Sequence, residues 1–350
     1  MSLSGHILTV VGARPQFIKA APVSRALRAA GLKEHLLHTG QHYDAAMSAQ
    51  FFDELDMPTP THQLGINRLD HGAMTGRMLE AIEQVILRER PALVLVYGDT
   101  NSTLAGALAA AKLHIPVAHV EAGLRSFNRT MPEEINRVLT DHLSRLLFCP
   151  TEASVAHLQR EGITQGVMHV GDVMMDATLQ AAERAATASS ILQQQAITPG
   201  HYRVCTLHRA ENTDDPNRLR QWVSWLEAEA AAQAGPILWP MHPRTAAMLK
   251  EHGLTLQRVR TIAPLGYLDM VQLVRHASHI YTDSGGLQKE AYFHRVPCVT
   301  LREETEWVET IEAGWNRLWK TPEYQPRRDI SDYGNGHASQ RIAEQLAQMI

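Results

Sequence analysis

Three acidic residues stand where carboxylates could move protons to and from a substrate. Asp99 follows the apolar run LVLVYG, Glu121 follows PVAHV, and Glu133 falls in the first turn of the helix that TMPEEINR predicts. A carboxylate at the tip of an apolar strand is partly desolvated, and neighbouring like charges raise one another's pKa. One group can then accept a proton while another donates one, so we expect general acid–base chemistry here.

Each carboxylate also has a structural alternative. Asp99 precedes a predicted helix start and could simply cap that helix. Glu133 and its neighbour Glu134 both fall in a first helical turn, where the helix dipole stabilises negative charge. Three carboxylate oxygens could instead hold Mg²⁺, but no Asp-x-Asp pair accompanies them, which disfavours a metal site.

Two cationic residues follow the first predicted strand. The segment VVGARPQFIKAAP has Gly12 where a dinucleotide-binding motif would begin, but it lacks the second and third glycines of that motif. Arg14 and Lys19 instead place two positive charges in a strand-to-helix loop, beside Pro15 at the predicted helix start. We expect them to bind an anion; a solvated helix end is the alternative.

Histidine lies close to arginine at two strand ends in the second half of the chain. His208 stands in CTLHRAEN and His242 in WPMHPR. A single histidine is more often structural than catalytic, but two such pairs at the ends of strands in one sheet favour a phosphate-binding region.

The segment YTDSGGLQKEA gives the clearest binding motif. Ser284, Gly285 and Gly286 lie between a predicted strand and a predicted helix, where bare backbone N–H groups and a helix N-terminus can cradle a diphosphate. Glu290, further along that helix, could reach the hydroxyls of an attached ribose. A tight turn is the alternative for the two glycines alone.

The elements that must position these residues alternate between short β-rich runs and longer helical patterns, as in βαβ units built on parallel sheets. The predicted strands are 7–11, 35–38, 93–96, 117–120, 146–149, 168–170, 203–207, 237–239, 260–262, 279–282 and 298–301. The predicted helices of the first half are 15–30, 71–90, 102–113 and 133–144.

This order predicts an α/β protein with two Rossmann-like, doubly wound parallel-sheet domains and an interdomain cleft. We expect an N-terminal domain over 1–173 with the catalytic carboxylates, a linking helix and turn over 174–199, and a C-terminal nucleotide-binding domain over 200–336. Residues 337–350 have the pattern of an amphipathic helix, which we expect to pack back on the first domain.

Composition excludes several classes of protein. The 350 residues are 44% hydrophobic, and 33 basic residues against 37 acidic ones give no sign of nucleic-acid binding. Neither a signal peptide nor a membrane-spanning run is recognisable, and the three cysteines lie singly in apolar runs, as expected of reduced thiols in a cytoplasmic protein. The 19 histidines show no metal-ligand spacing, so no metal site is predicted.

The strings GARPQFIKAAP, YGDTNST, HVEAGLRS, PEEINR, LHR, TDSGG and QKEA occur in this order and resemble the non-hydrolysing UDP-N-acetylglucosamine 2-epimerases, over about residues 7 to 319. The resemblance implies a fold like the B-type glycosyltransferases, a UDP-sugar substrate, a homodimer and no cofactor. By motif position the family's catalytic residues match Asp99, Glu121, Glu133 and His208. Its ligand-binding residues match Arg14, Lys19, Arg137, Ser284, Gly285, Gly286 and Glu290.

The resemblance also implies a reaction. The family converts UDP-N-acetylglucosamine to UDP-N-acetylmannosamine by eliminating UDP to give 2-acetamidoglucal and then adding UDP back with the opposite configuration at C2. Carboxylates would move the proton, and the cations and the Ser-Gly-Gly loop would stabilise the charge that grows on departing UDP. Domain closure would keep the glycal from escaping.

Two departures from the family pattern leave the substrate and the regulation open. The short loop LRSFNRTMPEE, together with YGDTNST, is similar to the branch that acts on UDP-2,3-diacetamido-2,3-dideoxyglucuronate, whose carboxylate could meet Arg129. Gln41 and His42 match the family's regulatory UDP-sugar site, but Asp44 stands where a glutamine is usual. A UDP-sugar glycosyltransferase and an inactive UDP-sugar-binding regulator are the alternatives of other classes.

Overall fold

The chain folds into two compact units. The structure, a computed structural model, describes residues 5–41 and 49–350. Unit 1 comprises Met1–Ala177 and Ser331–Ile350, and unit 2 comprises Thr178–Ile330.

The division between the units falls within helix α7 (Val173–Ala188). The segment expected as a separate link over 174–199 is therefore shared between the units, and its short helix α8 (Ile191–Gln194) belongs to unit 2. The C-terminal helix α15 (Ala338–Ala347) belongs to unit 1, where it packs against the first helix, α1 (Arg14–Ala29).

Unit 1 is built on a parallel sheet that, within the described residues, has seven strands in the order β3-β2-β1-β4-β5-β6-β7. The strands are β1 (Ile7–Val11), β2 (Glu34–His38), β3 (His62–Gln63), β4 (Leu93–Tyr97), β5 (Val117–Val120), β6 (Leu146–Cys149) and β7 (Val167–His169). β1 pairs with β4, so the direction of strand succession reverses between them. In open α/β sheets, ligands bind at the carboxyl ends beside such a switch point.

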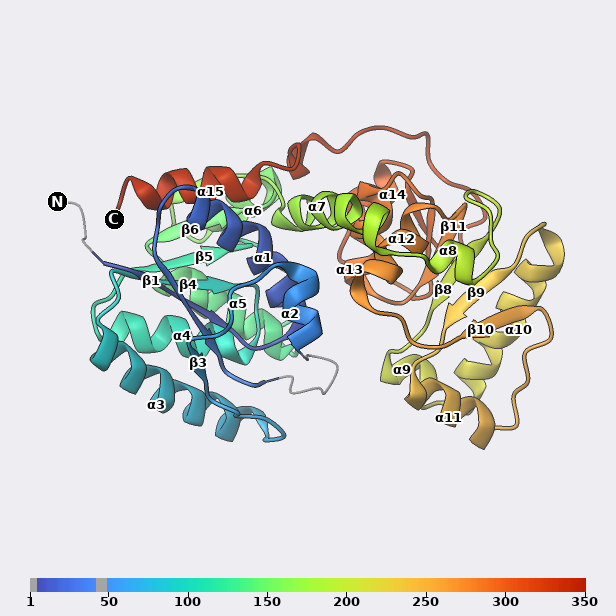
Figure 1. Cartoon of the computed structure of the whole chain (residues 1–350), viewed down its shortest axis with the longest axis horizontal. Helices are drawn as coiled ribbons and strands as arrows, with labels where there is room; N and C mark the ends of the chain where they lie inside the picture. Colours follow the sequence, from blue (N-terminus) through green and yellow to red (C-terminus); the bar gives the residue numbers. More distant parts are fainter. Residues whose placement is uncertain (1–4, 42–48) are drawn as a thin grey trace. The chain divides into compact units, whose positions relative to one another are not determined.

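Helices cover both faces of this sheet. Besides α1, α7 and α15, they are α2 (Ala49–Leu55), α3 (His71–Glu89), α4 (Asn101–Lys112), α5 (Pro132–Leu143) and α6 (Glu152–Arg160), with a 3₁₀ turn at Ser331–Tyr333. Figure 1 shows α3 and α4 on one face of the sheet and α1 and α15 on the other. Leu8, Val94 and Val96 share a buried core with Met78 and Ile82 of α3, which fixes which strand residues face that helix.

Unit 2 repeats the architecture with a parallel sheet in the order β10-β9-β8-β11-β12-β13. Its strands are β8 (Arg203–Thr206), β9 (Ile237–Pro240), β10 (Val259–Ile262), β11 (His279–Thr282), β12 (Cys298–Thr300) and β13 (Asn316–Leu318). Its other helices are α9 (Ala210–Thr213), α10 (Pro216–Ala232), α11 (Pro243–Glu251), α12 (Tyr267–Arg275), α13 (Gly285–Phe293) and α14 (Val308–Glu312). The switch point of this sheet lies between β8 and β11.

The predicted fold class, two Rossmann-like parallel sheets, is confirmed. All eleven predicted strands are present, with ends that differ by at most one residue, whereas β3 and β13 were not predicted. Both are edge strands of two or three residues, too short to display an alternating pattern.

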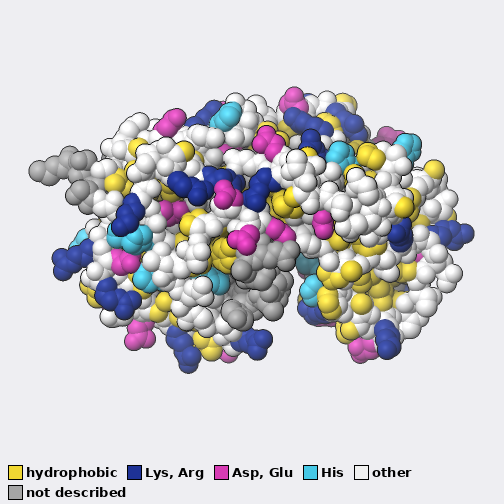
Figure 2. Space-filling model, viewed as in Figure 1, with side chains coloured by type: hydrophobic (Ala, Val, Ile, Leu, Met, Phe, Trp, Pro, Cys, Tyr) yellow, Lys and Arg dark blue, Asp and Glu magenta, His cyan; other side chains and the backbone are white. Residues whose placement is uncertain are grey.

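The surface and the thiols agree with the sequence analysis. Cys149, Cys205 and Cys298 are free and buried, as expected. On the face shown in Figure 2, Lys and Arg side chains are interspersed with Asp and Glu. Among the described helices, none has both the length and the apolar character that crossing a membrane requires.

Candidate active site

The loops after β1 and β4 meet at the switch point of unit 1 through the side chain of Gln16. Its Oε1 accepts hydrogen bonds from the backbone N–H groups of Gly12 (2.8 Å) and Ala13 (3.0 Å). Its Nε2 donates to the carbonyl of Tyr97 (2.8 Å) and to Oγ1 of Thr103 (2.9 Å). Gln16 thereby joins the loop between β1 and α1 to the loop that contains Asp99. It is buried and was not predicted as a site residue.

Glu121 lies at the carboxyl end of β5 and forms an ion pair with Lys19 of α1. Both side chains are largely buried, at 6% and 15% exposure respectively. The backbone of Glu121 has a φ of +74°, a value that residues other than glycine rarely adopt. This conformation costs about 1–3 kcal/mol of backbone strain. Strain of this kind concentrates at functional sites, and here it accompanies a buried carboxylate at the predicted position.

Gly98 leaves the room that this ion pair occupies. Its φ is +60°, and a Cβ at this position would lie 3.3 Å from Oε2 of Glu121 and 3.7 Å from Nζ of Lys19. The loop after β4 therefore passes directly against the pair. Asp99 is the next residue of the same turn.

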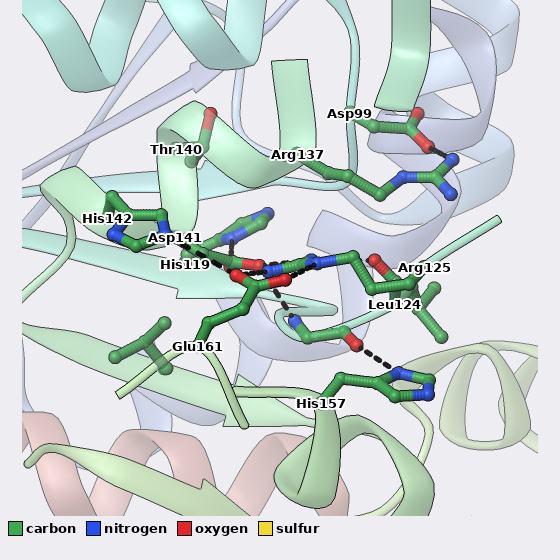
Figure 3. A network of polar contacts seen from close by, with 12 residues as sticks. Asp99, His119, Leu124, Arg125, Arg137, Thr140, Asp141, His142, His157 and Glu161 are labelled. Atoms are coloured by element: carbon green, nitrogen blue, oxygen red, sulfur yellow. Dashed lines mark hydrogen bonds and ion pairs between the residues drawn. The ribbon is translucent and has the colours of Figure 1, made fainter. Parts of the chain in front are cut away.

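Asp99 forms an ion pair with Arg137 of α5 (Figure 3). The Asp99 side chain is 32% exposed and that of Arg137 is 14% exposed. The side chain of Asn136 donates to the carbonyl of Asp99 (3.0 Å), so two consecutive residues of α5 hold this loop. Arg137 also donates to Glu134 at 3.0 Å. The pairings of Asp99 and Glu121 with cations were not anticipated from the sequence, which suggested carboxylates facing one another.

The two acidic residues in the first turn of α5 differ in their surroundings. Glu134 is buried, and its carboxylate accepts hydrogen bonds from the backbone N–H groups of Ser126 and Phe127, both at 2.9 Å. Although burial raises the pKa of Glu134, these bonds and Arg137 lower it below its usual value. Glu133 is exposed, so burial does not act on this carboxylate. A first-turn residue on the outer side of an amphipathic helix faces solvent, whereas its neighbour points inward.

A buried hydrogen-bond network holds the backbone of the loops that carry Asp99 and Glu121 (Figure 3). His119 of β5 is fully buried; its Nε2 lies 2.7 Å from the carbonyl oxygen of Gly98, and its Nδ1 lies 2.7 Å from Oδ1 of Asp141. Asp141 also accepts from Arg125 (2.7 Å) and from the N–H of Gly123 (3.1 Å). Burial raises the pKa of Asp141, but His119 and Arg125 outweigh it and bring the pKa below its ordinary value. The backbone that precedes Asp99 is thereby held by β5 and α5.

In unit 2, His208 and Asp283 meet across the switch point. Nδ1 of His208 lies 3.0 Å from Oδ1 of Asp283, and the imidazole is 53% exposed whereas the carboxylate is fully buried. Asp283 also accepts from the N–H groups of His208 (3.0 Å) and Arg209 (2.9 Å). Burial raises the pKa of Asp283, but the hydrogen bond with His208 and the other donors lower it overall. An ionised carboxylate only accepts, so Nδ1 of His208 donates and Nε2 is left for a ligand.

The Ser-Gly-Gly segment begins α13 as predicted. Oγ of Ser284 caps the helix by accepting from the N–H of Leu287 (3.4 Å). A Cβ at Gly285 would lie 2.3 Å from Oε1 of Glu306, so a larger residue there would require the Glu306 side chain to shift. Gly286 is exposed and has open space beside it, which leaves the N–H groups of the first helical turn accessible to an anion. Glu290 follows further along the same helix and is half-buried.

The remaining predicted residues lie at loop ends. Arg14 is exposed at the first position of α1, and His242 is exposed at the N-terminus of α11, where its Nδ1 accepts from the N–H of Arg244 (3.3 Å). Oε1 of Gln41 accepts from the hydroxyl of Ser102 (2.7 Å). His42 and Asp44 lie outside the described residues.

Sequence reasoning missed the residues that hold the reactive groups in place, namely Gln16, His119, Asp141 and Asp283. Asp283 stood in the quoted motif TDSGG, and its position directly after an apolar strand was the same signal that singled out Asp99. His119 and Asp141 gave no such signal, because one lies inside a strand and the other inside a helix.

The chain is an α/β protein of two doubly wound units, with carboxylates beside one switch point and a glycine-rich helix start at the other. Comparison with known proteins identifies the family. Residues 25–347 match the family model described as UDP-N-acetylglucosamine 2-epimerase, and the chain belongs to this family of isomerases.

Similar proteins include the UDP-2,3-diacetamido-2,3-dideoxy-D-glucuronate 2-epimerase of Pseudomonas aeruginosa, 50% identical over 98% of this chain and 99% of that protein. The UDP-N-acetylglucosamine 2-epimerase of Methanocaldococcus jannaschii is 43% identical over 96% and 97% of the two chains. The crystal structure of the enzyme from that organism in complex with UDP-GlcNAc and UDP is similar with a TM-score of 0.84 at 42% identity, and covers 98% of this chain and 99% of the other.

Proposed function

We propose that this protein inverts the configuration at C2 of a UDP-linked 2-acetamido sugar, converting UDP-N-acetylglucosamine to UDP-N-acetylmannosamine and back. The observation that carries the proposal is the pair of carboxylates, Asp99 and Glu121, fastened at the switch point of unit 1 in a chain of this family. Epimerisation takes a proton from one face of C2 and returns one to the other face. It therefore requires at least two proton-transferring groups.

The proton at C2 is not acidic enough for simple removal, so elimination is the chemically reasonable route. The bond between C1 and the diphosphate oxygen breaks, and its electron pair leaves with UDP. The proton of C2 passes to a base, and the electron pair of the C2–H bond forms the double bond of 2-acetamidoglucal. Protonation of C2 from the opposite face and return of the UDP oxygen to C1 complete the inversion.

Asp99, Glu121, Glu133 and His208 are the candidates for proton transfer. Burial and the contact with Lys19 fix the position of the Glu121 carboxylate. The contact with Arg137 does the same for Asp99, which remains partly accessible. His208 presents Nε2 outward because Asp283 holds Nδ1.

The loop after β11 is suited to the diphosphate. Ser284, Gly285 and Gly286 begin a helix whose first N–H groups and dipole favour negative charge, and that charge is greatest when UDP departs. Arg14, Lys19, Arg137 and His242 are the proposed supporting cations and donors. Glu290 is the proposed partner of the ribose hydroxyls.

A second substrate is favoured by a specific observation. The relative that is 50% identical carries the name of a UDP-2,3-diacetamido-2,3-dideoxy-D-glucuronate 2-epimerase, and the same reaction at C2 serves that sugar. Its carboxylate would require a cation, and Arg129 lies exposed in the loop before α5. UDP-N-acetylglucosamine has no such carboxylate, so Arg129 distinguishes the two substrates.

The test is to incubate the purified protein with each UDP-sugar separately, without an acceptor. Formation of the C2 epimer supports epimerase activity, and the ratio of kcat/KM for the two sugars identifies the preferred one. Transfer of the sugar only when an acceptor is added would favour a glycosyltransferase, and binding without turnover would favour a regulator. If the diacetamido sugar is preferred, Arg129→Gln should reduce that preference and leave turnover of UDP-N-acetylglucosamine unchanged.

A homodimer and a cytoplasmic location, both expected from the sequence, remain proposals. Light scattering of the purified chain tests the first.

A further inference from the structure

Three histidines from separate segments surround one glutamate in unit 1. Nε2 of His6 and Nδ1 of His35 lie 3.0 Å and 2.9 Å from Oε2 of Glu89, and Nε2 of His62 lies 2.7 Å from Oε1. The four side chains are between 12% and 22% exposed. The cluster is therefore largely buried but reachable from solvent.

The register of the sheet explains why the histidines meet. In β1 and β2, Leu8 is paired with His35; in β2 and β3, Leu37 is paired with His62. Side chains alternate between the faces of a sheet, so His35 and Leu37 share a face, and His6 shares the face of Leu8. All three histidines thus point to one side of the sheet.

Helix α3 supplies the glutamate to the same side. Leu8 and Leu37 pack in one core cluster with Met78, Ile82 and Val85 of α3, so this helix covers the face on which the histidines lie. Glu89 is the last residue of α3 and continues the inward-facing stripe by one more turn. The C-terminal end of a helix carries partial negative charge, which favours a cation beside Glu89.

The donor set has the chemistry of a metal site. Ligand atoms of His6, His35 and Glu89 all lie within 4.8 Å of one another, and the rings of His6 and His35 are 4.0 Å apart between centroids. Zn²⁺ binds imidazole nitrogens and carboxylate oxygens at about 2.0–2.2 Å, four at a time in structural sites. His6, His35 and Glu89 supply three of these four ligands, and a water molecule can complete the number. His62 contacts the other carboxylate oxygen of Glu89 and can hold that side chain in position.

We propose that His6, His35 and Glu89 bind one divalent transition-metal ion, with Zn²⁺ the best match to the donors, and that His62 positions the Glu89 carboxylate. The site lies at the amino-terminal side of the sheet, whereas the candidate catalytic residues follow the carboxyl ends of β4 and β5. Its role is structural: the ion ties the start of β1, β2 and the end of α3 together. This metal site goes beyond the proposed epimerase activity and does not depend on that activity.

The first experiment uses the full chain after treatment with a chelator. Titration with Zn²⁺ alone should give one tightly bound ion per chain and raise the melting temperature. Co²⁺ in its place should give the visible absorption bands of a tetrahedral complex. If the wild-type chain takes up no stoichiometric metal, the cluster is a hydrogen-bonded one only and the proposal is overturned, whatever the variants do.

Variants then locate the ion. His35→Gln and Glu89→Gln each remove one ligand and should weaken Zn²⁺ binding by at least about tenfold, with the Co²⁺ bands lost or shifted. His201→Gln, an exposed histidine of unit 2, is the matched control and should bind Zn²⁺ as the wild type does. Unchanged stoichiometry and affinity in both ligand variants would contradict the assignment. Circular dichroism checks that each variant is folded.

Discussion

The ammonium group of Lys19 in α1 contacts the carboxylate of Glu121 at the end of β5, across 102 positions of the chain. The pair is mostly buried and lies against Gly98, whose lack of a side chain leaves room for it. Removing one partner of a buried pair leaves the other charge uncompensated, which is far more costly than losing an exposed pair. Lys19 therefore fixes the position of the Glu121 carboxylate.

The first prediction concerns this cation. Lys19→Met should lower kcat by at least about tenfold, because Glu121 would lose the contact that fixes its carboxylate. Steady-state kinetics with the preferred UDP-sugar measure the effect. Lys112→Met, at an exposed position in the last turn of α4, is the control and should keep the kinetics of the wild type. Equal kcat in both variants would mean that the pair is only structural.

The second prediction concerns the carboxylates. Asp99→Asn, Glu121→Gln and Glu133→Gln should each lower kcat at least about a hundredfold, the usual scale of general acid–base catalysis, because each amide has the same shape without a titratable proton. Caps or dipole partners would instead lose about 1 kcal/mol of stability with kcat unchanged. Turnover near the wild-type value in all three variants would contradict the catalytic roles and favour an inactive UDP-sugar-binding regulator.

A third prediction separates the neighbours Glu133 and Glu134. Glu134→Gln should lower the free energy of unfolding by about 1–3 kcal/mol, because a neutral amide cannot match the bonds that the buried carboxylate accepts from Ser126 and Phe127. Glu133→Gln should leave the melting temperature unchanged while kcat falls, since Glu133 is exposed. Thermal unfolding of both variants checks this. A loss of stability in Glu133→Gln and a loss of kcat alone in Glu134→Gln would mean that Glu133 is the structural residue and Glu134 the catalytic one.

Most of the fold was predictable because its strands are short apolar runs that alternate with helical segments. β4, for example, is five consecutive buried residues, which no surface element would carry. The two missed strands are short edge strands, and they are added by the tertiary structure rather than by local pattern.

The candidate site was predictable where a polar residue interrupts the end of an apolar strand, as at Asp99 and Glu121. The exposure of Glu133 was not, because its helical turn contains two glutamates and only packing decides which points inward. The pairings Lys19–Glu121 and Arg137–Asp99 join residues far apart in the chain, and a single sequence does not report such contacts. The histidine cluster around Glu89 escaped detection for the same reason, since strand register rather than spacing assembles it.

The buried network below the site makes a prediction about pH. The pKa of Asp141 is lowered in the folded state, so its stabilising effect is present above its unfolded pKa of about 4 and is lost as the pH falls through the folded value. Asp141→Asn should cost about 3–5 kcal/mol at pH 7, and the difference from the wild type should shrink below about pH 4. Urea unfolding at several pH values measures both. A difference that stays constant down to pH 3 would contradict the lowered pKa.

Glu290 should affect binding rather than chemistry. A contact with the ribose hydroxyls is made equally in the ground and transition states, so Glu290→Ala should raise KM with little change in kcat. A large fall in kcat at constant KM would place Glu290 in the reaction instead. Calorimetric titration with UDP gives an independent measure of the lost affinity.

Exchange of the C2 proton with solvent is the most direct test of proton transfer at that carbon. The protein is incubated in D₂O with UDP-N-acetylglucosamine and, separately, with the diacetamido uronate, and the product is examined by NMR and mass spectrometry. We expect an epimer that carries deuterium at C2, because the proton removed from one face is replaced from the other by a group in exchange with solvent. An epimer formed without deuterium at C2 would contradict proton transfer at that carbon and with it the proposed roles of Asp99 and Glu121.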